Sequence, residues 1–407
     1  MSKTILIISG GAEAVPGIKL AKRLGLKVVV SDADPNAPGF EFADYKLIAS
    51  TYDFDATVTA ATKFHKNVNP IDGVICIASD VPLTVAKVAD KLKLPGISIA
   101  SAKLAIDKLA MKNCFLKANV SVPWFTNIES ATDLKDKVKN HGFPLVIKPV
   151  DSRGSRGVLR LLEDTDLEWA YNTAKKYSPT GRVMLEKFMT GPQVSTESII
   201  VNGTAYTIGF SDRNYEFLDK YAPHIIENGG QLPSQLDYKT KKAVESLIQV
   251  SSKSMGIKDG IVKGDIVITD GKPYVIELAA RLSGGYFCTH EIPLNTGVDL
   301  VGAAIRQALG EEINLKDLQC KYNRPVAQRY MFPKPGKVSS VDLPKWVLND
   351  PDVSFFELRI NKGDIVKPIL NHPSRAGVVI ATGSKISEAI NKAKNVVSSI
   401  KIVTEAI

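Results

Sequence analysis

The sequence predicts a mixed protein of the α/β and α+β classes that folds as more than one domain. At 407 residues the chain is longer than one hydrophobic core normally supports, so we expect two to three domains. Strand and helix signals alternate over residues 1–107, which is typical of a doubly wound parallel sheet. A glycine-rich loop directly after a buried strand, within residues 143–158, indicates a phosphate-binding site in the part that follows.

The composition is that of an ordinary globular protein, with 44% hydrophobic and 23% charged residues. No apolar run reaches the eighteen or so residues of a membrane span, and the N-terminus is typical of a first strand and not of a signal peptide. The cysteines are far apart and form no CxxC pair, which favours reduced thiols and a cytoplasmic protein. They are Cys76, Cys114, Cys288 and Cys320.

The net charge of +9 comes from 52 basic and 43 acidic residues that are interspersed along the chain. No basic block with interleaved aromatic residues occurs, so we expect no nucleic-acid partner. A moderately positive field suits an anionic substrate such as a nucleotide. The five histidines are scattered without metal-ligand spacing.

The first hundred residues predict a parallel sheet that acts as a scaffold. Expected strands lie at 4–8, 27–30 and 72–78, with helices at 16–24, 55–64 and 81–92. Gly10-Gly11 follows the first strand, and Asp32 lies where the ribose-binding acid of a dinucleotide site would lie. The segment GGAEAVPG lacks the third glycine of that motif, which disfavours nicotinamide binding. The sheet is then a scaffold or a surface for a second substrate.

The loop after the strand at 143–147 carries the phosphate-binding hypothesis. Lys148 ends the strand, and Ser152, Gly154, Ser155 and Gly157 follow. Glycines let backbone N–H groups approach a phosphate, and a lysine supplies a compact positive charge. The alternative is a plain turn with an exposed lysine. A lysine at the end of a buried strand needs a counter-charge, which favours an anionic partner.

Several further elements frame this loop. Residues 101–118 predict one helix, on which Lys108 and Lys112 share a face and could equally be solvated. Strands are expected at 182–188 and 194–201, and Asn202-Gly203 predicts a hairpin turn to a strand at 205–210. The polar stretch 211–235 predicts a long functional loop. Further predicted elements are helices at 239–255, 299–309 and 385–400, and short strands from about residue 320 onward.

Two acidic residues lie on a second predicted hairpin. Strands at 264–268 and 273–278 carry Asp265 and Glu277, and Asp270-Gly271 forms the turn between them. Both carboxylates can converge on one face, and magnesium takes oxygen ligands. The alternative is two surface acids on a hairpin. Arg281 follows and suits a carboxylate or phosphoryl oxygen in bidentate geometry.

In their order and spacing along the whole chain, these motifs resemble the ATP-grasp superfamily. The likeness is to its carboxylate–amine ligase branch, which is related to biotin carboxylase, D-alanine–D-alanine ligase and the glycinamide ribonucleotide synthetase group. The resemblance implies a Rossmann-like pre-ATP-grasp domain at 1–107, an ATP-grasp domain of two α+β subdomains at 108–319, and a small C-terminal α+β domain at 320–407.

The resemblance also implies roles for individual residues. Lys108 and Lys148 match the two ATP lysines, and the loop residues 155–157 match the phosphate-covering loop. The hinge residues 186–189 match the segment that reads adenine through backbone groups. Gln193 stands where the family usually has a ribose-binding glutamate, and Glu197 is the alternative for that role or faces the triphosphate. The implied nucleotide-binding residues are Lys108, Lys148, Ser155, Arg156, Gly157, Glu186, Lys187, Met189 and Gln193.

Asp265 and Glu277 match the family's magnesium ligands. The family signature E-x-N-x-R appears here as residues 277–281, with Ala279 in place of the asparagine, so fewer protein ligands are expected. Arg281 is retained and, with Lys148, is the expected catalytic group.

The implied activity is an ATP-dependent ligase that converts a carboxylate to an acyl phosphate and joins it to an amine. The cofactors would be ATP and Mg²⁺, with Mn²⁺ as a substitute, and the partners small-molecule carboxylates and amines. A homodimer, which is common in the family, is a candidate assembly. The alternatives are a bicarbonate-dependent carboxylase and a non-catalytic ATP-binding protein. Candidates for contact with the second substrate are Arg213, Lys220, His224 and Glu227, and the alternative for each is a structural or solvated side chain.

Overall fold

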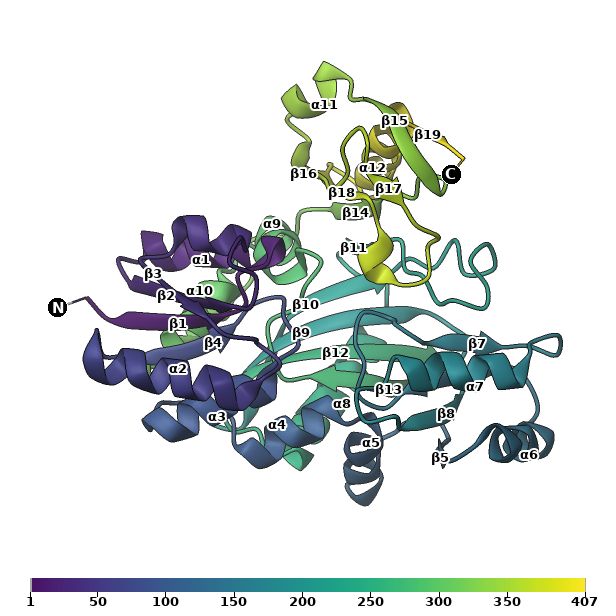
Figure 1. The fold of residues 1–407 in the computed structure, drawn as a ribbon, viewed down its shortest axis with the longest axis horizontal. Helices are drawn as coiled ribbons and strands as arrows, with labels where there is room; N and C mark the ends of the chain where they lie inside the picture. Colours follow the sequence, from purple (N-terminus) through teal and green to yellow (C-terminus); the bar gives the residue numbers. More distant parts are fainter. Residues whose placement is uncertain (1, 407) are drawn as a thin grey trace.

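The computed structural model describes residues 2–406, which fold into lobes around one large antiparallel sheet (Figure 1). The N-terminal lobe is a parallel sheet with strand order β3-β2-β1-β4, as predicted. Alternate residues of β1 face opposite ways: Ile5 and Ile7 pack towards α1 and α10, whereas Leu6 and Ile8 pack towards α2 and α3. The elements are β1 (Thr4–Ile8), α1 (Val15–Arg23), β2 (Lys27–Asp32), β3 (Tyr45–Ile48), α2 (Phe54–Asn67), β4 (Gly73–Cys76), α3 (Pro82–Leu92) and α10 (Leu300–Ala308), with short turns η1 (Ala12–Ala14) and η2 (Pro38–Phe42).

The prediction of a single helix at 101–118 is wrong. Two helices, α4 (Ile99–Ile106) and α5 (Lys108–Lys117), meet at Asp107, which has extended backbone angles. The Asp107 carboxylate accepts a hydrogen bond from the Ala110 N–H at 2.8 Å and so caps α5. Aspartate competes with the helix for backbone donors, and here the N-cap is favoured over the helix interior.

The second lobe holds the glycine loop. Its antiparallel sheet has the order β5-β8-β6-β7, and α6 and α7 cover one face. The loop at 150–158 joins β6 to β7, and β7 is a short strand that the sequence did not predict. The elements are β5 (Phe125–Ile128), α6 (Ala131–His141), β6 (Leu145–Pro149), β7 (Leu159–Leu161), α7 (Leu167–Lys176) and β8 (Val183–Lys187).

The central sheet has eight strands in the order β13-β12-β9-β10-β11-β14-β18-β16. Both predicted hairpins are present, and α8 covers part of one face. The predicted loop at 211–235 is shorter than expected, because β10 continues to Arg213 and β11 begins at Gly230. The elements are β9 (Gln193–Val201), β10 (Thr204–Arg213), β11 (Gly230–Leu232), α8 (Tyr238–Ser254), β12 (Gly260–Thr269), β13 (Lys272–Ala279), η3 (Phe287–Glu291), α9 (Ile292–Thr296), β14 (Val326–Tyr330), β16 (Val353–Leu358) and β18 (Gly377–Thr382).

The C-terminal lobe continues this sheet and adds a small three-stranded sheet of order β17-β15-β19 (Figure 1). The central sheet therefore crosses the predicted boundary at residue 319/320, and the division into three domains stays a prediction. The strand β19 at the C-terminus was not predicted. The remaining elements are η4 (Leu315–Leu318), β15 (Gly336–Asp342), α11 (Lys345–Asn349), β17 (Ile365–Val366), η5 (His372–Ser374), α12 (Ile386–Ser399) and β19 (Lys401–Glu405).

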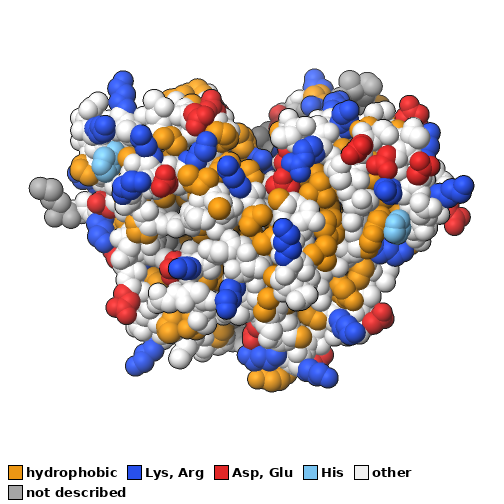
Figure 2. Space-filling model, turned by 90° about the horizontal axis from the view of Figure 1, so that it is seen from below, with side chains coloured by type: hydrophobic (Ala, Val, Ile, Leu, Met, Phe, Trp, Pro, Cys, Tyr) orange, Lys and Arg blue, Asp and Glu red, His pale blue; other side chains and the backbone are white. Residues whose placement is uncertain are grey.

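The surface shows the interspersed charge that the sequence predicts. On the face seen in Figure 2, lysine and arginine side chains are spread among acidic, apolar and uncharged ones and form no single basic block. None of the helices in residues 2–406 has the length and apolar character needed to span a bilayer.

Candidate active site

One cavity of about 570 Å³ lies where the lobes meet. Its walls come from the ends of the parallel strands β1 and β4, the glycine loop, one face of the central sheet, and the segment 372–375 of the C-terminal lobe. Eleven of the twelve residues predicted for the site line this cavity, and Gly157 does not. The eleven are Lys108, Lys148, Ser155, Arg156, Glu186, Lys187, Met189, Gln193, Asp265, Glu277 and Arg281.

Lys148 is part of a buried charge cluster. Its Nζ atom lies 2.5 Å from Glu186 Oε1, and Lys112 Nζ lies 3.1 Å from Glu186 Oε2. All three side chains are almost fully buried. Burial lowers the pKa of Lys112 to about 8, with the neighbouring Lys148 acting in the same direction and Glu186 against it. Two ammonium groups share one carboxylate, so the cluster has an excess positive charge that suits an anionic phosphate.

The structure excludes solvated lysines at both positions on α5. Lys112 is fully buried, and Lys108 is only 7% exposed. Lys108 Nζ donates to the Ser152 carbonyl at 2.7 Å and lies 3.2 Å from Glu277 Oε1. Lys108 therefore links the glycine loop to a predicted magnesium ligand. Sequence reasoning placed Lys112 on the same face but missed its pairing with Glu186, because the partner comes from another lobe.

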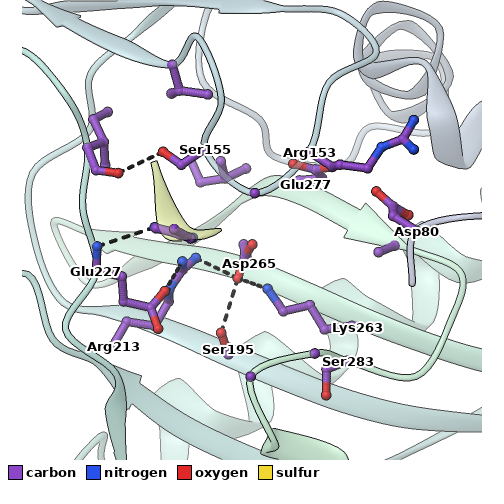
Figure 3. Close-up of a pocket in the computed structure, with 18 of the residues that line it drawn as sticks. Asp80, Arg153, Ser155, Ser195, Arg213, Glu227, Lys263, Asp265, Glu277 and Ser283 are labelled. Carbon is purple, nitrogen blue, oxygen red and sulfur yellow. Dashed lines mark hydrogen bonds and ion pairs between the residues drawn. The ribbon is translucent and has the colours of Figure 1, made fainter. Parts of the chain in front are cut away.

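The glycine loop adopts the left-handed backbone that its composition permits. Gly154, Ser155 and Gly157 have φ values of +66°, +60° and +71°. A Cβ atom at Gly157 would lie 3.0 Å from the rings of Pro149 and Tyr177. Gly157 thus shapes the loop from behind, outside the cavity lining. The Ser155 hydroxyl donates to the Ile225 carbonyl at 2.7 Å (Figure 3).

We expect Gly157→Ala to lower the melting temperature and to raise the KM for ATP. The left-handed backbone costs an alanine about 1–2 kcal/mol, and the close contacts at its Cβ add to that. Gly271→Ala is the matched control, because Gly271 has φ +73° with nothing within 4 Å of its Cβ position. Thermal melts and ATP kinetics should show a larger effect at Gly157. Equal melting shifts would contradict the packing role.

The hinge residues lie at the end of β8. The Lys187 N–H donates to the Trp124 carbonyl at 2.9 Å, and the Phe188 N–H donates to the Pro144 carbonyl at 3.3 Å. Because the Glu186 side chain is held by two lysines, only its backbone remains to read a base. Met189 and Gln193 line the same wall, and the roles of these residues toward adenine and ribose stay predictions.

Asp265 and Glu277 lie directly opposite each other on β12 and β13, as the hairpin predicts. Figure 3 shows Arg213, Lys263 and Ser195 converging on the Asp265 carboxylate. Arg213 Nη1 lies 2.6 Å from Asp265 Oδ1, and the Ser195 hydroxyl donates to the same oxygen at 3.1 Å. Burial acts to raise the pKa of Asp265, but Arg213 and Lys263 outweigh it and hold the pKa well below the usual range.

These residues fit a magnesium ion that is bound partly by phosphate. Two carboxylates face the cavity, and cationic side chains occupy their oxygens in this structure. Within residues 2–406, no cluster of three or more His, Cys, Asp or Glu side chains could hold a metal unaided. Magnesium normally uses one or two carboxylates together with substrate phosphates and water, which matches this donor set.

Glu197 does not take the role suggested for it. It is fully buried, lies outside the cavity lining, and accepts hydrogen bonds from the Ser283 N–H, at 2.7 Å, and the Ser283 hydroxyl. Burial raises the pKa of Glu197 to about 7 against these hydrogen bonds. It therefore fixes the turn after Arg281 and has no access to a nucleotide.

We expect the melting temperature of Glu197→Gln, relative to the unsubstituted protein, to rise between pH 5 and pH 8. The folded state keeps Glu197 protonated up to a pKa of about 7, whereas a glutamate in the unfolded chain has its ordinary pKa of 4.5. The unsubstituted protein therefore loses stability as pH rises between these two values, whereas glutamine does not titrate. Melts at both pH values test this, with the exposed Glu405→Gln as control. A difference in melting temperature between Glu197→Gln and the unsubstituted protein that is the same at both pH values would contradict the prediction.

The second half of the cavity contains several pairs of opposite charge. Arg213 pairs with Glu227, Arg281 Nε lies 3.6 Å from Asp80 Oδ1, and Arg359 Nη2 lies 2.9 Å from Glu13 Oε1. Of the four second-substrate candidates, Arg213 and Glu227 line the cavity, whereas Lys220 and His224 do not. Sequence reasoning missed six other cavity residues, because none of them forms a recognisable motif of its own: Glu13, Asp80, Lys263, Arg359, His372 and Arg375.

Two protein families match this chain. Residues 105–285 match the ATP-grasp domain, and residues 329–405 match the L-amino acid ligase C-terminal domain 2. Biotin carboxylase from Pseudomonas aeruginosa is 24% identical, with 100% of this chain and 93% of that protein covered. D-alanine–D-alanine ligase from Aromatoleum aromaticum is 24% identical over 67% of this chain and 84% of that protein.

Among solved structures, L-amino acid ligase from Bacillus licheniformis superimposes with a TM-score of 0.84 at 21% identity and covers 99% of both chains. This likeness extends through the N-terminal sheet, the glycine-loop lobe and the C-terminal lobe. Residues 105–285, which hold most of the predicted phosphate-binding residues gathered in the cavity, therefore form an ATP-grasp domain, and the chain as a whole is similar to ATP-dependent carboxylate–amine ligases.

Proposed function

We propose that this protein is an ATP-dependent amino acid ligase. It activates the carboxylate of one amino acid as an acyl phosphate and joins it to the amine of a second, releasing ADP and phosphate. The observation that carries the proposal is the two-part cavity. One part gathers lysines at a glycine loop, and the other holds arginine–carboxylate pairs that suit a zwitterion. The match of residues 329–405 to the L-amino acid ligase domain supports it.

In this proposal the chain's residues act by charge and by position. Lys148 and Lys108 offset negative charge on the phosphates, and the glycine loop excludes water that would hydrolyse an acyl phosphate. Arg281 orients the carboxylate or a phosphoryl oxygen. Magnesium, held by Asp265 and Glu277, would supply further neutralisation of the developing charge.

Glu227 and Arg213 are the residues we assign to the second substrate. The Glu227 carboxylate can pair with an ammonium group, and its position beside Arg213 links it to Asp265. Fixing an amine next to an acyl phosphate can contribute about 7–11 kcal/mol of the barrier reduction. A homodimer and a cytoplasmic location stay predictions.

The test is magnesium-dependent ADP and phosphate release with L-amino acids supplied singly and in pairs, with products identified by mass. Turnover that needs a pair and yields a dipeptide is the expected result. ADP release with bicarbonate alone would overturn the proposal in favour of a carboxylase. ATP binding without turnover in every mixture, unaffected by Asp265→Asn, would overturn it in favour of a non-catalytic nucleotide-binding protein.

A further inference from the structure

The C-terminal lobe supplies one wall of the cavity through a short segment. The turn η5 (His372–Ser374) lies between β17 and β18, and His372, Pro373 and Arg375 all line the cavity. These residues are more than two hundred positions away from the glycine loop in the sequence. The segment therefore brings the last part of the chain against the loop that is expected to cover the phosphates.

His372 contacts the glycine loop through its backbone. The His372 N–H donates to the Gly154 carbonyl at 3.1 Å. The Pro373 ring lies 3.3 Å from the position that a Cβ atom would take at Gly154, which has a positive φ of +66°. The loop thus rests against the C-terminal lobe at its most exposed glycine.

The His372 side chain contacts the segment that carries Glu227. The Glu227 N–H donates to His372 Nε2 at 3.3 Å. Arg375 donates to the His372 carbonyl at 2.9 Å and to the Glu227 carbonyl at 3.4 Å. Arg375 also lies over the Tyr330 ring at 3.5 Å, which fixes its guanidinium.

The ring nitrogen of His372 can accept this hydrogen bond only when it is unprotonated. Burial holds the pKa of His372 well below its usual range, and the nearby Arg375 and Arg213 lower it further, against the opposite effect of Asp265. The acceptor state of Nε2 is therefore kept at neutral pH.

A third contact joins the glycine loop directly to the segment that carries Glu227. The Ser155 hydroxyl donates to the Ile225 carbonyl, so the glycine loop and the segment 223–229 are joined directly as well as through His372. Glu227 in turn pairs with Arg213, and Arg213 pairs with Asp265. A continuous set of contacts runs from the C-terminal lobe through the glycine loop to the magnesium carboxylate.

We propose that His372 is a positioning residue that fixes the glycine loop against the segment carrying Glu227. Closure of the loop over the phosphates is thereby coupled to correct placement of the second substrate. The coupling to the second substrate rests on the proposed function. The fixation of the loop depends only on the contacts above, so it can be tested without any substrate.

Opening of the glycine loop can be measured with trypsin, because trypsin cleaves after arginine and the loop contains Arg153 and Arg156. His372→Ala removes the Nε2 acceptor but keeps the backbone contact with Gly154. Cleavage at these two sites should become roughly tenfold faster, the effect of losing one hydrogen bond to a buried group. His372→Gln places an oxygen near the Nε2 position and should restore protection.

His65→Ala is the matched control. His65 Nδ1 also accepts a backbone hydrogen bond, from the Ile71 N–H at 3.0 Å, but it lies in the N-terminal lobe. In His65→Ala, trypsin should cleave the glycine loop at the same rate as in the unsubstituted protein. General unfolding would accelerate cleavage at the exposed Lys139 as well, so the ratio of loop cleavage to cleavage at Lys139 is the quantity to measure.

Equal loop-cleavage ratios in His372→Ala and His65→Ala would overturn the positioning role. In the ligase assay, His372→Ala should also release more ADP per amide formed, with glutamine restoring the ratio. If His372→Ala opens the loop to trypsin but releases no more ADP per amide than the unsubstituted protein, the coupling to the second substrate is overturned. Only the contact that holds the loop then remains. If the unsubstituted protein forms no amide, the proposed function fails, and the trypsin result still decides the role of His372.

Discussion

Replacing Lys148 with methionine is expected to reduce ATP turnover by about 10²–10³-fold, the usual effect of removing one preorganised charge-stabilising donor. Methionine fills the space of the lysine stem without its charge. The change leaves Glu186 paired with Lys112 at 3.1 Å, so the buried cluster becomes neutral and the fold should persist. Magnesium-dependent ADP release and a thermal melt measure the two effects separately.

Lys139→Met serves as the control, because Lys139 is exposed on α6. Its turnover and its melting temperature should equal those of the unsubstituted protein. Lys148 lies at the mouth of the glycine loop, 2.5 Å from Glu186 Oε1, and the assigned nucleotide site depends on its charge. Unchanged turnover in Lys148→Met would therefore show that this site is assigned wrongly.

Glu186→Gln should mainly reduce stability, whereas Lys148→Met should mainly reduce turnover. It leaves the ammonium groups of Lys148 and Lys112 buried together without a counter-charge. Removing one partner of a buried ion pair typically costs about 3–5 kcal/mol, so we expect a large drop in melting temperature. ATP or another polyphosphate should recover part of the loss, because its negative charge replaces that of the carboxylate. A loss of activity without a loss of stability would contradict this account of the cluster.

Patterns local in sequence predicted much of the fold and of the site. The parallel sheet followed from alternating strand and helix signals, and the hairpin carrying Asp265 and Glu277 followed from two strands joined by Asp270-Gly271. Side chains directly opposite on adjacent antiparallel strands share a face, so the convergence of these carboxylates could be foreseen. Lys148 was predictable because a buried strand ends at a lysine beside a glycine loop.

The contacts that could not be predicted join residues far apart in the chain. Lys112 and Glu186 meet across two lobes, and Glu227 and His372 are separated by 145 positions. No periodicity encodes such pairings, because they depend on how the lobes pack. The break between α4 and α5 had a local signal in Asp107, but an aspartate within an apolar helical pattern does not by itself distinguish an N-cap from a helix interior.

The second large effect is expected for Asp265 and Glu277, the carboxylates that we propose as magnesium ligands. Asp265→Asn and Glu277→Gln should each lower turnover and raise the magnesium concentration needed for half-maximal activity. The effect should be at least about 10²-fold, the upper end of the cost of replacing a residue that only supports a metal ligand. Titration of ATP turnover with Mg²⁺ measures it, with Asp270→Asn, in the exposed turn of the same hairpin, as control.

The two substitutions should differ in their effect on stability. Asp265 is shared by Arg213 and Lys263, so asparagine leaves two cations adjacent in a buried wall. Glu277 contacts Lys108 at 3.2 Å and is more exposed, so its substitution should disturb the fold less. We therefore expect a lower melting temperature for Asp265→Asn than for Glu277→Gln at similar magnesium defects. An unchanged magnesium requirement in both variants would mean that these carboxylates serve only to hold the surrounding cations, and the metal site would have to lie elsewhere.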